Sequence, residues 1–251
     1  MNKLILTVIF FLSIGFKSFG QFKKPVYFGL QVRPIFPSNA GGKQITKLTG
    51  NDFDFEMQQT IGYSFGGVVR RGITSLIFFE SGINFTQRNY NLKNSLLNES
   101  LITDDNWSFI TYDIPINALV FIKLSRKYYM NTSLGGSLRF SPSSIRKITE
   151  TGTEHSFRNY GTYTNKIGFN LNANVGFEYR TDRSGSFYLG GSICIPLGGI
   201  MDVYSFHKIQ QFTTETYVTG TDAGRYISID LRYFFYNKKI DPKNRIKGPI
   251  E

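Results

Sequence analysis

Eight charged residues stand on one face of segments in which apolar residues recur at every second position on the other face. If these segments lie side by side, the four carboxylates can pair with the four guanidinium groups. A dry interior would require such pairing, because an enclosed charge without a partner is strongly unfavourable. We therefore expect a structural network of ion pairs rather than a catalytic centre. Its predicted members are Glu80, Asp113, Glu178, Asp230, Arg88, Arg139, Arg180 and Arg232.

The two histidines offer a different chemistry. His155 is next to Ser156, and His207 follows Asp202 and Ser205. A His, Ser and Asp arrangement can activate a nucleophile. However, both histidines fall in segments expected to be loops, where such residues are common and no spacing brings them together. No metal-ligand spacing or phosphate-binding glycine loop is present either. We expect no catalytic residue, metal or cofactor, and a hydrolase with a loop histidine site is an alternative.

The segment 164–180 shows which elements carry these residues. Its apolar side chains recur every second residue, and glycine, asparagine or a charged residue stands between them. This period of two is the pattern of a β-strand with one apolar and one polar face. The apolar positions are Ile167, Phe169, Leu171, Ala173, Val175, Phe177 and Tyr179. With no helix to cover that face, repetition of the pattern fits a barrel with lipid outside and a polar interior.

Eight segments share this alternation, and none has a charged residue on its apolar face. A charge facing the middle of a bilayer costs roughly 2–4 kcal/mol in such barrels, so this absence favours a membrane-facing surface. The sequence therefore predicts an all-β protein, an eight-stranded antiparallel up-and-down transmembrane β-barrel. The predicted strands are Val26–Arg33, Thr60–Arg70, Ser75–Arg88, Phe109–Lys123, Tyr128–Phe140, 164–180, Ser186–Leu197 and Arg225–Tyr236.

The connections between these strands alternate in length. Short turns surround Arg71-Gly72, Ser125-Arg126 and Asp182–Gly185, and the other four connections are much longer. Outer-membrane barrels have short periplasmic turns and long extracellular loops, and this pattern predicts the same. Two prolines interrupt the scheme, Pro115 and Pro196. Because proline donates no ladder hydrogen bond, we expect a bulge or an early end of pairing at each.

The remaining composition sets limits on location and partners. The apolar run Leu4–Phe16 is too short to span a bilayer and follows Lys3, so residues 1–20 are predicted to be a signal peptide. Residues 21–236 then form the barrel, and 237–251 form a basic periplasmic tail. The net charge of +11 is scattered rather than gathered on one face, so we expect no nucleic-acid partner. The single Cys194 excludes an intramolecular disulfide framework.

Several motifs resemble one known family. The element Tyr112–Ile116, with its aromatic, acidic and Ile-Pro residues, and the preceding segment Phe79–Arg88 resemble the PorT-like outer-membrane β-barrel proteins common in Bacteroidetes. The glycine-rich Ser133–Gly136 and the segment Gly176–Tyr179 match the same style. The resemblance extends over residues 22–236. It implies an eight-stranded barrel in the outer membrane, in a family whose members mostly have no assigned role.

An eight-stranded barrel is just wide enough for side chains to fill its interior. We therefore expect a non-enzymatic outer-membrane protein of the cell envelope, with a plugged polar interior and surface loops for binding or for assembly of an envelope complex. The alternatives are a narrow gated pore or transport-associated barrel, and an outer-membrane barrel hydrolase. The expected partners are outer-membrane lipid, the barrel insertion machinery and an envelope or cell-surface protein. The expected location is the cell outer membrane, as an integral protein after removal of the signal peptide.

Overall fold

The computed structural model describes residues 26–38, 45–74, 76–151, 155–181, 184–209 and 215–236. The predicted signal peptide and the predicted basic tail lie outside these residues. Within them the chain forms thirteen β-strands, and it contains no helix long and apolar enough to cross a membrane.

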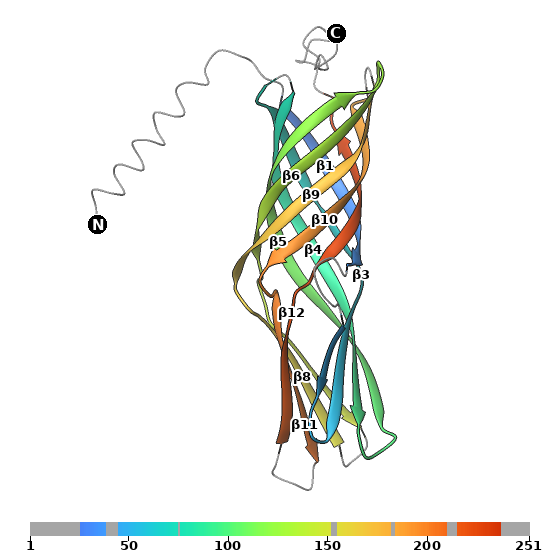
Figure 1. The fold of residues 1–251 in the computed structure, drawn as a ribbon, viewed down its shortest axis with the longest axis vertical. Helices are drawn as coiled ribbons and strands as arrows, with labels where there is room; N and C mark the ends of the chain where they lie inside the picture. The colour runs from blue at the N-terminus through green and yellow to red at the C-terminus, as the bar shows by residue number, and fades with distance from the viewer. Residues whose placement is uncertain are drawn as a thin grey trace, which may run out of the picture.

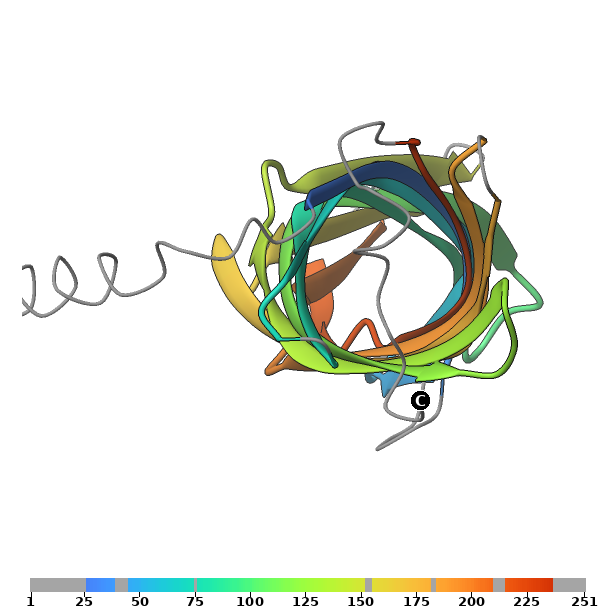
Figure 2. The ribbon, with the colours of Figure 1, turned by 90° about the horizontal axis from the view of Figure 1, so that it is seen from above.

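Eight strands close into a barrel, as Figure 2 shows in a view along its axis. Each pairs antiparallel with its neighbours, and β1 pairs with both β13 and β3, which leaves no free edge in the ring. The predicted fold class is therefore confirmed. The barrel strands are β1 (Val26–Pro37), β3 (Phe53–Gly72), β4 (Ile77–Leu96), β5 (Ile102–Lys123), β6 (Tyr128–Phe140), β9 (Ile167–Arg180), β10 (Ser186–Leu197) and β13 (Tyr226–Phe234).

The outer surface of the barrel is an apolar band. Large side chains such as Leu30, Leu134 and Ile229 point outward and remain exposed. Aromatic rings gather near the two limits of this band, as in the girdles of membrane barrels. Near the short turns they include Tyr128, Tyr179, Phe187 and Tyr233, and near the opposite end Tyr63, Phe65, Phe85 and Tyr112.

The long connections are not the loops that the sequence analysis predicted. Strands β3, β4 and β5 continue beyond the barrel, and five further strands stand beside them in the lower part of Figure 1. Four of the five form a separate sheet in the order β12-β11-β8-β7, and β2 pairs with β3. The additional strands are β2 (Ile45–Thr49), β7 (Ile145–Thr151), β8 (His155–Tyr163), β11 (Met201–Ile209) and β12 (Glu215–Asp222). We call these five strands, together with residues 53–60, 89–96 and 102–109, the distal head.

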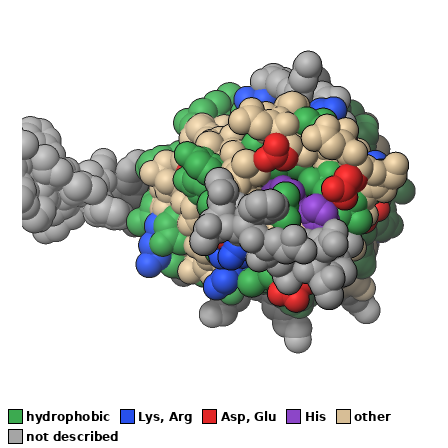
Figure 3. Space-filling view, turned by 90° about the horizontal axis from the view of Figure 1, so that it is seen from below, with side chains coloured by type: hydrophobic (Ala, Val, Ile, Leu, Met, Phe, Trp, Pro, Cys, Tyr) green, Lys and Arg blue, Asp and Glu red, His purple; other side chains and the backbone are tan. Residues whose placement is uncertain are grey.

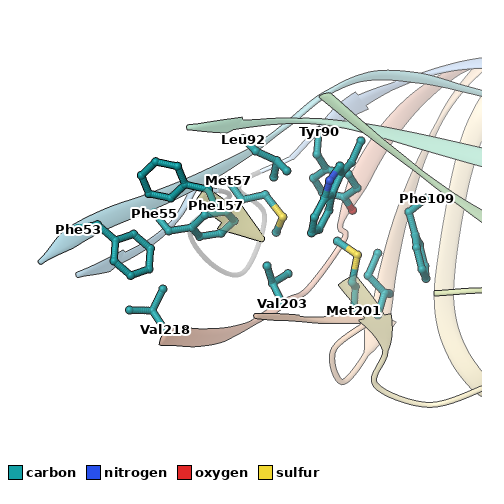
Figure 4. Close-up of a cluster of buried hydrophobic side chains, with 12 residues drawn as sticks. Phe53, Phe55, Met57, Tyr90, Leu92, Phe109, Phe157, Met201, Val203 and Val218 are labelled. Atoms are coloured by element: carbon teal, nitrogen blue, oxygen red, sulfur yellow. The ribbon is translucent and has the colours of Figure 1, made fainter. Parts of the chain in front are cut away.

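The distal head has a hydrophobic core of its own. Figure 4 shows side chains from its two sheets pointing toward one another, among them Phe55 of β3, Phe157 of β8 and Val203 of β11. Full burial of one such side chain contributes about 1.5–3 kcal/mol, so this core stabilises the strands of the head. The buried members are Phe53, Phe55, Met57, Tyr90, Leu92, Trp107, Phe109, Phe157, Ile200, Met201, Val203 and Val218.

A bulge in β3 allows one alternation of apolar and polar residues to continue from the distal head into the barrel. The register of β3 against β4 shifts between Thr60 and Tyr63. Before the shift the apolar Phe55 and Met57 face the core of the head, and after it Tyr63 faces outward from the barrel. One extra residue therefore exchanges the inner and outer faces of the strand.

The two prolines behave differently from each other. The β4–β5 ladder is interrupted opposite Pro115 and resumes in the same register, so the strand carries no bulge there. The pairing of β10 with β13 ends at Cys194, shortly before Pro196. The expected early end of pairing is therefore found on that side only, because the pairing of β10 with β9 continues through Pro196 to Leu197. Both arrangements spare a ladder bond that proline cannot make.

Candidate functional site

A continuous chain of alternating charges lies inside the barrel near the short turns. Every carboxylate in it contacts a guanidinium group, and the three acids balance the three arginines. Five of the eight predicted residues belong to it. In order, its members are Arg180, Glu178, Arg70, Glu80, Arg232 and Asp230.

Arg70 joins the two halves of this network. Its Nη2 lies 2.9 Å from Glu80 Oε2, and its Nη1 lies 2.5 Å from Glu178 Oε2. Glu80 Oε1 also accepts a hydrogen bond from Arg232 Nη1, at 2.6 Å. The side chains of Arg70, Glu80 and Glu178 are each only 3% exposed, so their charges depend on one another. Arg70 was missed as a site residue, although it lies on the inward phase of the predicted Thr60–Arg70 strand.

The other three predicted residues lie nearer the distal head and are held differently. Asp113 accepts hydrogen bonds from Thr86 Oγ1 at 2.9 Å and Asn170 Nδ2 at 3.0 Å. Among the described residues, Arg88 and Arg139 donate to hydroxyl, amide and backbone carbonyl oxygens rather than to carboxylates. The structure therefore does not bring all eight residues into direct ion pairs.

Packed side chains fill the barrel interior on both sides of the ion-pair network. Toward the short turns, Arg70 stacks on the ring of Phe234 and Arg180 on that of Tyr129, each at 3.9 Å from the ring centre. Phe78 and Phe121 pack edge-on beside them. Between the network and Asp113 is a cavity of about 30 Å³, which has room for about two water molecules. The interior is filled in the manner expected of eight strands.

The two histidines meet in the distal head. His155 Nδ1 lies 3.1 Å from His207 Nε2, and His155 Nε2 lies 3.3 Å from Glu99 Oε2. Figure 3 shows the two imidazoles side by side at the tip of the head. His207 also stacks on Phe157, with ring centres 4.9 Å apart. The result is a continuous chain of polar contacts that joins Glu99, His155 and His207.

The surroundings keep His207 in its neutral form. Burial lowers the pKa of His207, and the neighbouring His155 lowers it further, while Asp52 and Glu99 act in the opposite direction. His207 therefore meets His155 as an uncharged ring, and the two rings are joined by an N–H···N hydrogen bond.

The proposed His, Ser and Asp combination is not assembled. Asp202 accepts bonds from Thr164 at 3.0 Å and Thr221 at 2.7 Å. The Ser205 hydroxyl lies between the side-chain oxygens of Asn94 and Asn159, at 3.1 and 2.6 Å. Within the part of the chain that the structure describes, no three His, Cys, Asp or Glu residues are placed to hold a metal ion.

Comparison with known proteins supports the fold and goes no further. No protein-family model matches the chain, and no curated protein matches it, so the PorT-like resemblance stays a resemblance. The outer membrane protein OprG from Pseudomonas aeruginosa is similar in structure, with a TM-score of 0.50 and 10% identity over 85% of this chain and 98% of OprG. The outer membrane protease OmpT from Escherichia coli matches weakly, with a TM-score of 0.28 and 8% identity over 84% of this chain and 93% of OmpT. The chain thus has the fold of an outer-membrane β-barrel.

Proposed function

We propose that this chain is a non-enzymatic, non-conducting outer-membrane protein of the cell envelope that presents its distal head at the cell surface for binding. The observation that carries this proposal is the combination of a filled barrel with a folded head. A diffusion channel needs an open interior, whereas a rigid projecting sheet pair offers a stable binding surface. The PorT-like resemblance supports an envelope role.

The orientation follows from the lengths of the connections. The short turns lie at one end of the barrel. The start of β1 and the end of β13 lie at the same end. In outer-membrane barrels the short turns face the periplasm. The distal head then projects outside the cell, beyond the aromatic girdle.

The first test measures both the location of the protein and its conductance. Extraction from outer-membrane fractions should give a protein whose gel migration shifts on boiling, the mark of a folded barrel. In planar bilayers the same protein should produce no single-channel steps. Steps of porin size would refute the filled interior, and small gated steps would favour the narrow pore.

The proposal of no enzymatic activity has a separate test. Purified barrel should release no product from lipid esters or peptides. If a product did appear and was lost in His207→Ala, the hydrolase alternative would replace the proposal.

A further inference from the structure

The two outer faces of the distal head differ in chemistry. The sheet of β7, β8, β11 and β12 carries Tyr160, Tyr204, Phe206 and Tyr217 on its outer face, and we call these four residues the aromatic row. The sheet of β2 to β5 carries no aromatic side chain on its outer face among the described residues. It presents Lys47, Glu56, Gln58, Asn91, Lys93, Asp104, Asn106 and Ser108 instead. Because both faces belong to the same head, this contrast is not a requirement of the fold.

The aromatic row is held in place by its own contacts. The ring of Phe206 lies 5.6 Å from that of Tyr160 and 5.7 Å from that of Tyr217. The guanidinium of Arg146 lies 5.1 Å from the Tyr160 ring centre, and that of Arg158 lies 5.7 Å from the Phe206 ring centre. These contacts order the rings before a ligand arrives, which lowers the entropy that binding would cost.

A hollow of about 410 Å³ opens beside this row, a size typical of small-ligand sites. Its lining combines flat rings, four hydroxyl groups, two of them phenolic, and one guanidinium. These groups belong to Ser144, Arg158, Tyr160, Thr162, Tyr204 and Phe206. Aromatic faces accept the C–H side of a sugar ring, and hydroxyl and guanidinium groups bond the oxygens around its edge.

The hollow lies next to the lipid-facing band. Ser144 follows Phe140, the last exposed ring of β6, and Thr162 precedes Ile167, the first exposed residue of β9. Lys166, which lies between Thr162 and Ile167 in the chain, has its Nζ 5.8 Å from the Phe140 ring centre. A group bound here would stand at the level of lipid headgroups, with its acyl chains against the barrel.

Three cationic and three acidic side chains lie around the hollow, and two of the cations are guanidinium groups. Arg146 and Lys166 are exposed, and Arg158 shares its charge with Glu215. Of the neighbouring acids, Asp202 is engaged by two threonines and Glu150 is exposed on β7. Guanidinium groups are well suited to phosphate.

We propose that the hollow binds the phosphorylated sugar headgroup of a glycolipid in the outer leaflet, such as lipopolysaccharide. This inference rests on the proposed function, because the head must lie outside the cell. The ligand is a sugar carried by a lipid, because the hollow adjoins the lipid-facing band.

The test compares four ligands on the full-length protein folded in zwitterionic detergent. Purified lipopolysaccharide should bind. The same lipid without its phosphates, the free phosphorylated oligosaccharide and phosphatidylglycerol should each bind at least about tenfold more weakly. They lack, in that order, the charge-assisted phosphate contact, the acyl chains and the sugar. Equal binding of the dephosphorylated lipid or of phosphatidylglycerol would overturn recognition of a phosphorylated sugar. Equal binding of the free oligosaccharide would overturn the lipid-borne source.

Variants on the two faces of the head provide the matched comparison. Arg146→Gln and Tyr204→Ser change exposed side chains and should each weaken lipopolysaccharide binding by about tenfold. Lys93→Gln, on the polar face, should leave it unchanged, and equal effects on both faces would overturn the inference. Surface labelling of Tyr217→Cys on intact cells separates the two proposals. A labelled head without selective binding overturns only this inference, whereas an unlabelled head overturns the proposed function as well.

Discussion

His155 and His207 stand 52 positions apart in the chain, yet their Nδ1 and Nε2 atoms are 3.1 Å apart at the tip of the distal head. The bond requires that one ring nitrogen carry a proton and the other none. Protonation of both rings would leave two N–H groups facing each other. The pair is therefore sensitive to acid.

The first prediction concerns pH. Because the pKa of His207 is lower in the folded protein than its ordinary value of 6.5, the unfolded chain binds the proton more readily. The stability of the head should be complete above about pH 6.5 and should fall as the pH drops through the lower, folded-state pKa. Trp107, the single tryptophan, is buried in the head core and reports its unfolding by fluorescence. His207→Gln should flatten the dependence below about pH 6.5, and an unchanged profile would contradict the prediction.

The second prediction concerns Arg70. Arg70→Met removes the group that joins Glu80 to Glu178 and leaves buried carboxylates with fewer partners. We expect the free energy of unfolding to fall by about 3–5 kcal/mol, measured as a lower urea midpoint in lipid vesicles. Arg71→Gln, at the exposed neighbouring position, is the control and should change little. Equal midpoints for the two variants would show that the network does not stabilise the barrel.

The third prediction concerns the bulge of β3. A Cβ atom added at Gly62 would lie 2.2 Å from the backbone oxygen of Gln87, so Gly62→Ala must displace one strand from the other. We expect a loss of more than about 1 kcal/mol of stability or failure to fold. Gly67→Ala is the matched control on the same strand, because a Cβ there meets no atom within 4 Å. The readout is the fraction of protein whose gel migration shifts on boiling, and a normal fraction for Gly62→Ala would argue against a strict requirement for glycine.

The fourth prediction separates the head from the barrel. Phe157→Ala leaves a cavity in the head core and should cost about 3–5 kcal/mol there. Trp107 fluorescence should then change at lower urea, while the heat-dependent gel shift of the barrel persists. Ile102→Ala removes an apolar side chain that is 55% exposed and should have little effect. Loss of the gel shift in Phe157→Ala would mean that head and barrel unfold together.

The period-two pattern by itself determined the barrel. The predicted strands Tyr128–Phe140 and Ser186–Leu197 coincide with β6 and β10, since lipid on one side and a polar interior on the other impose a strong chemical contrast. The inward phase of Glu80, Glu178 and Arg232 followed from the same alternation. These properties are local, because each depends only on which face of one strand a residue occupies.

Only the tertiary structure decided the distal head and the partners of each charge. In β3 the same alternation continues through the bulge, so the sequence does not reveal that Phe55 faces a protein core whereas Tyr63 faces lipid. Strand register decides which residues become partners. It places Arg70 beside Glu178, 108 positions away, and it places His155 beside His207. Register is set by pairing and closure over the whole sheet, which no single segment encodes.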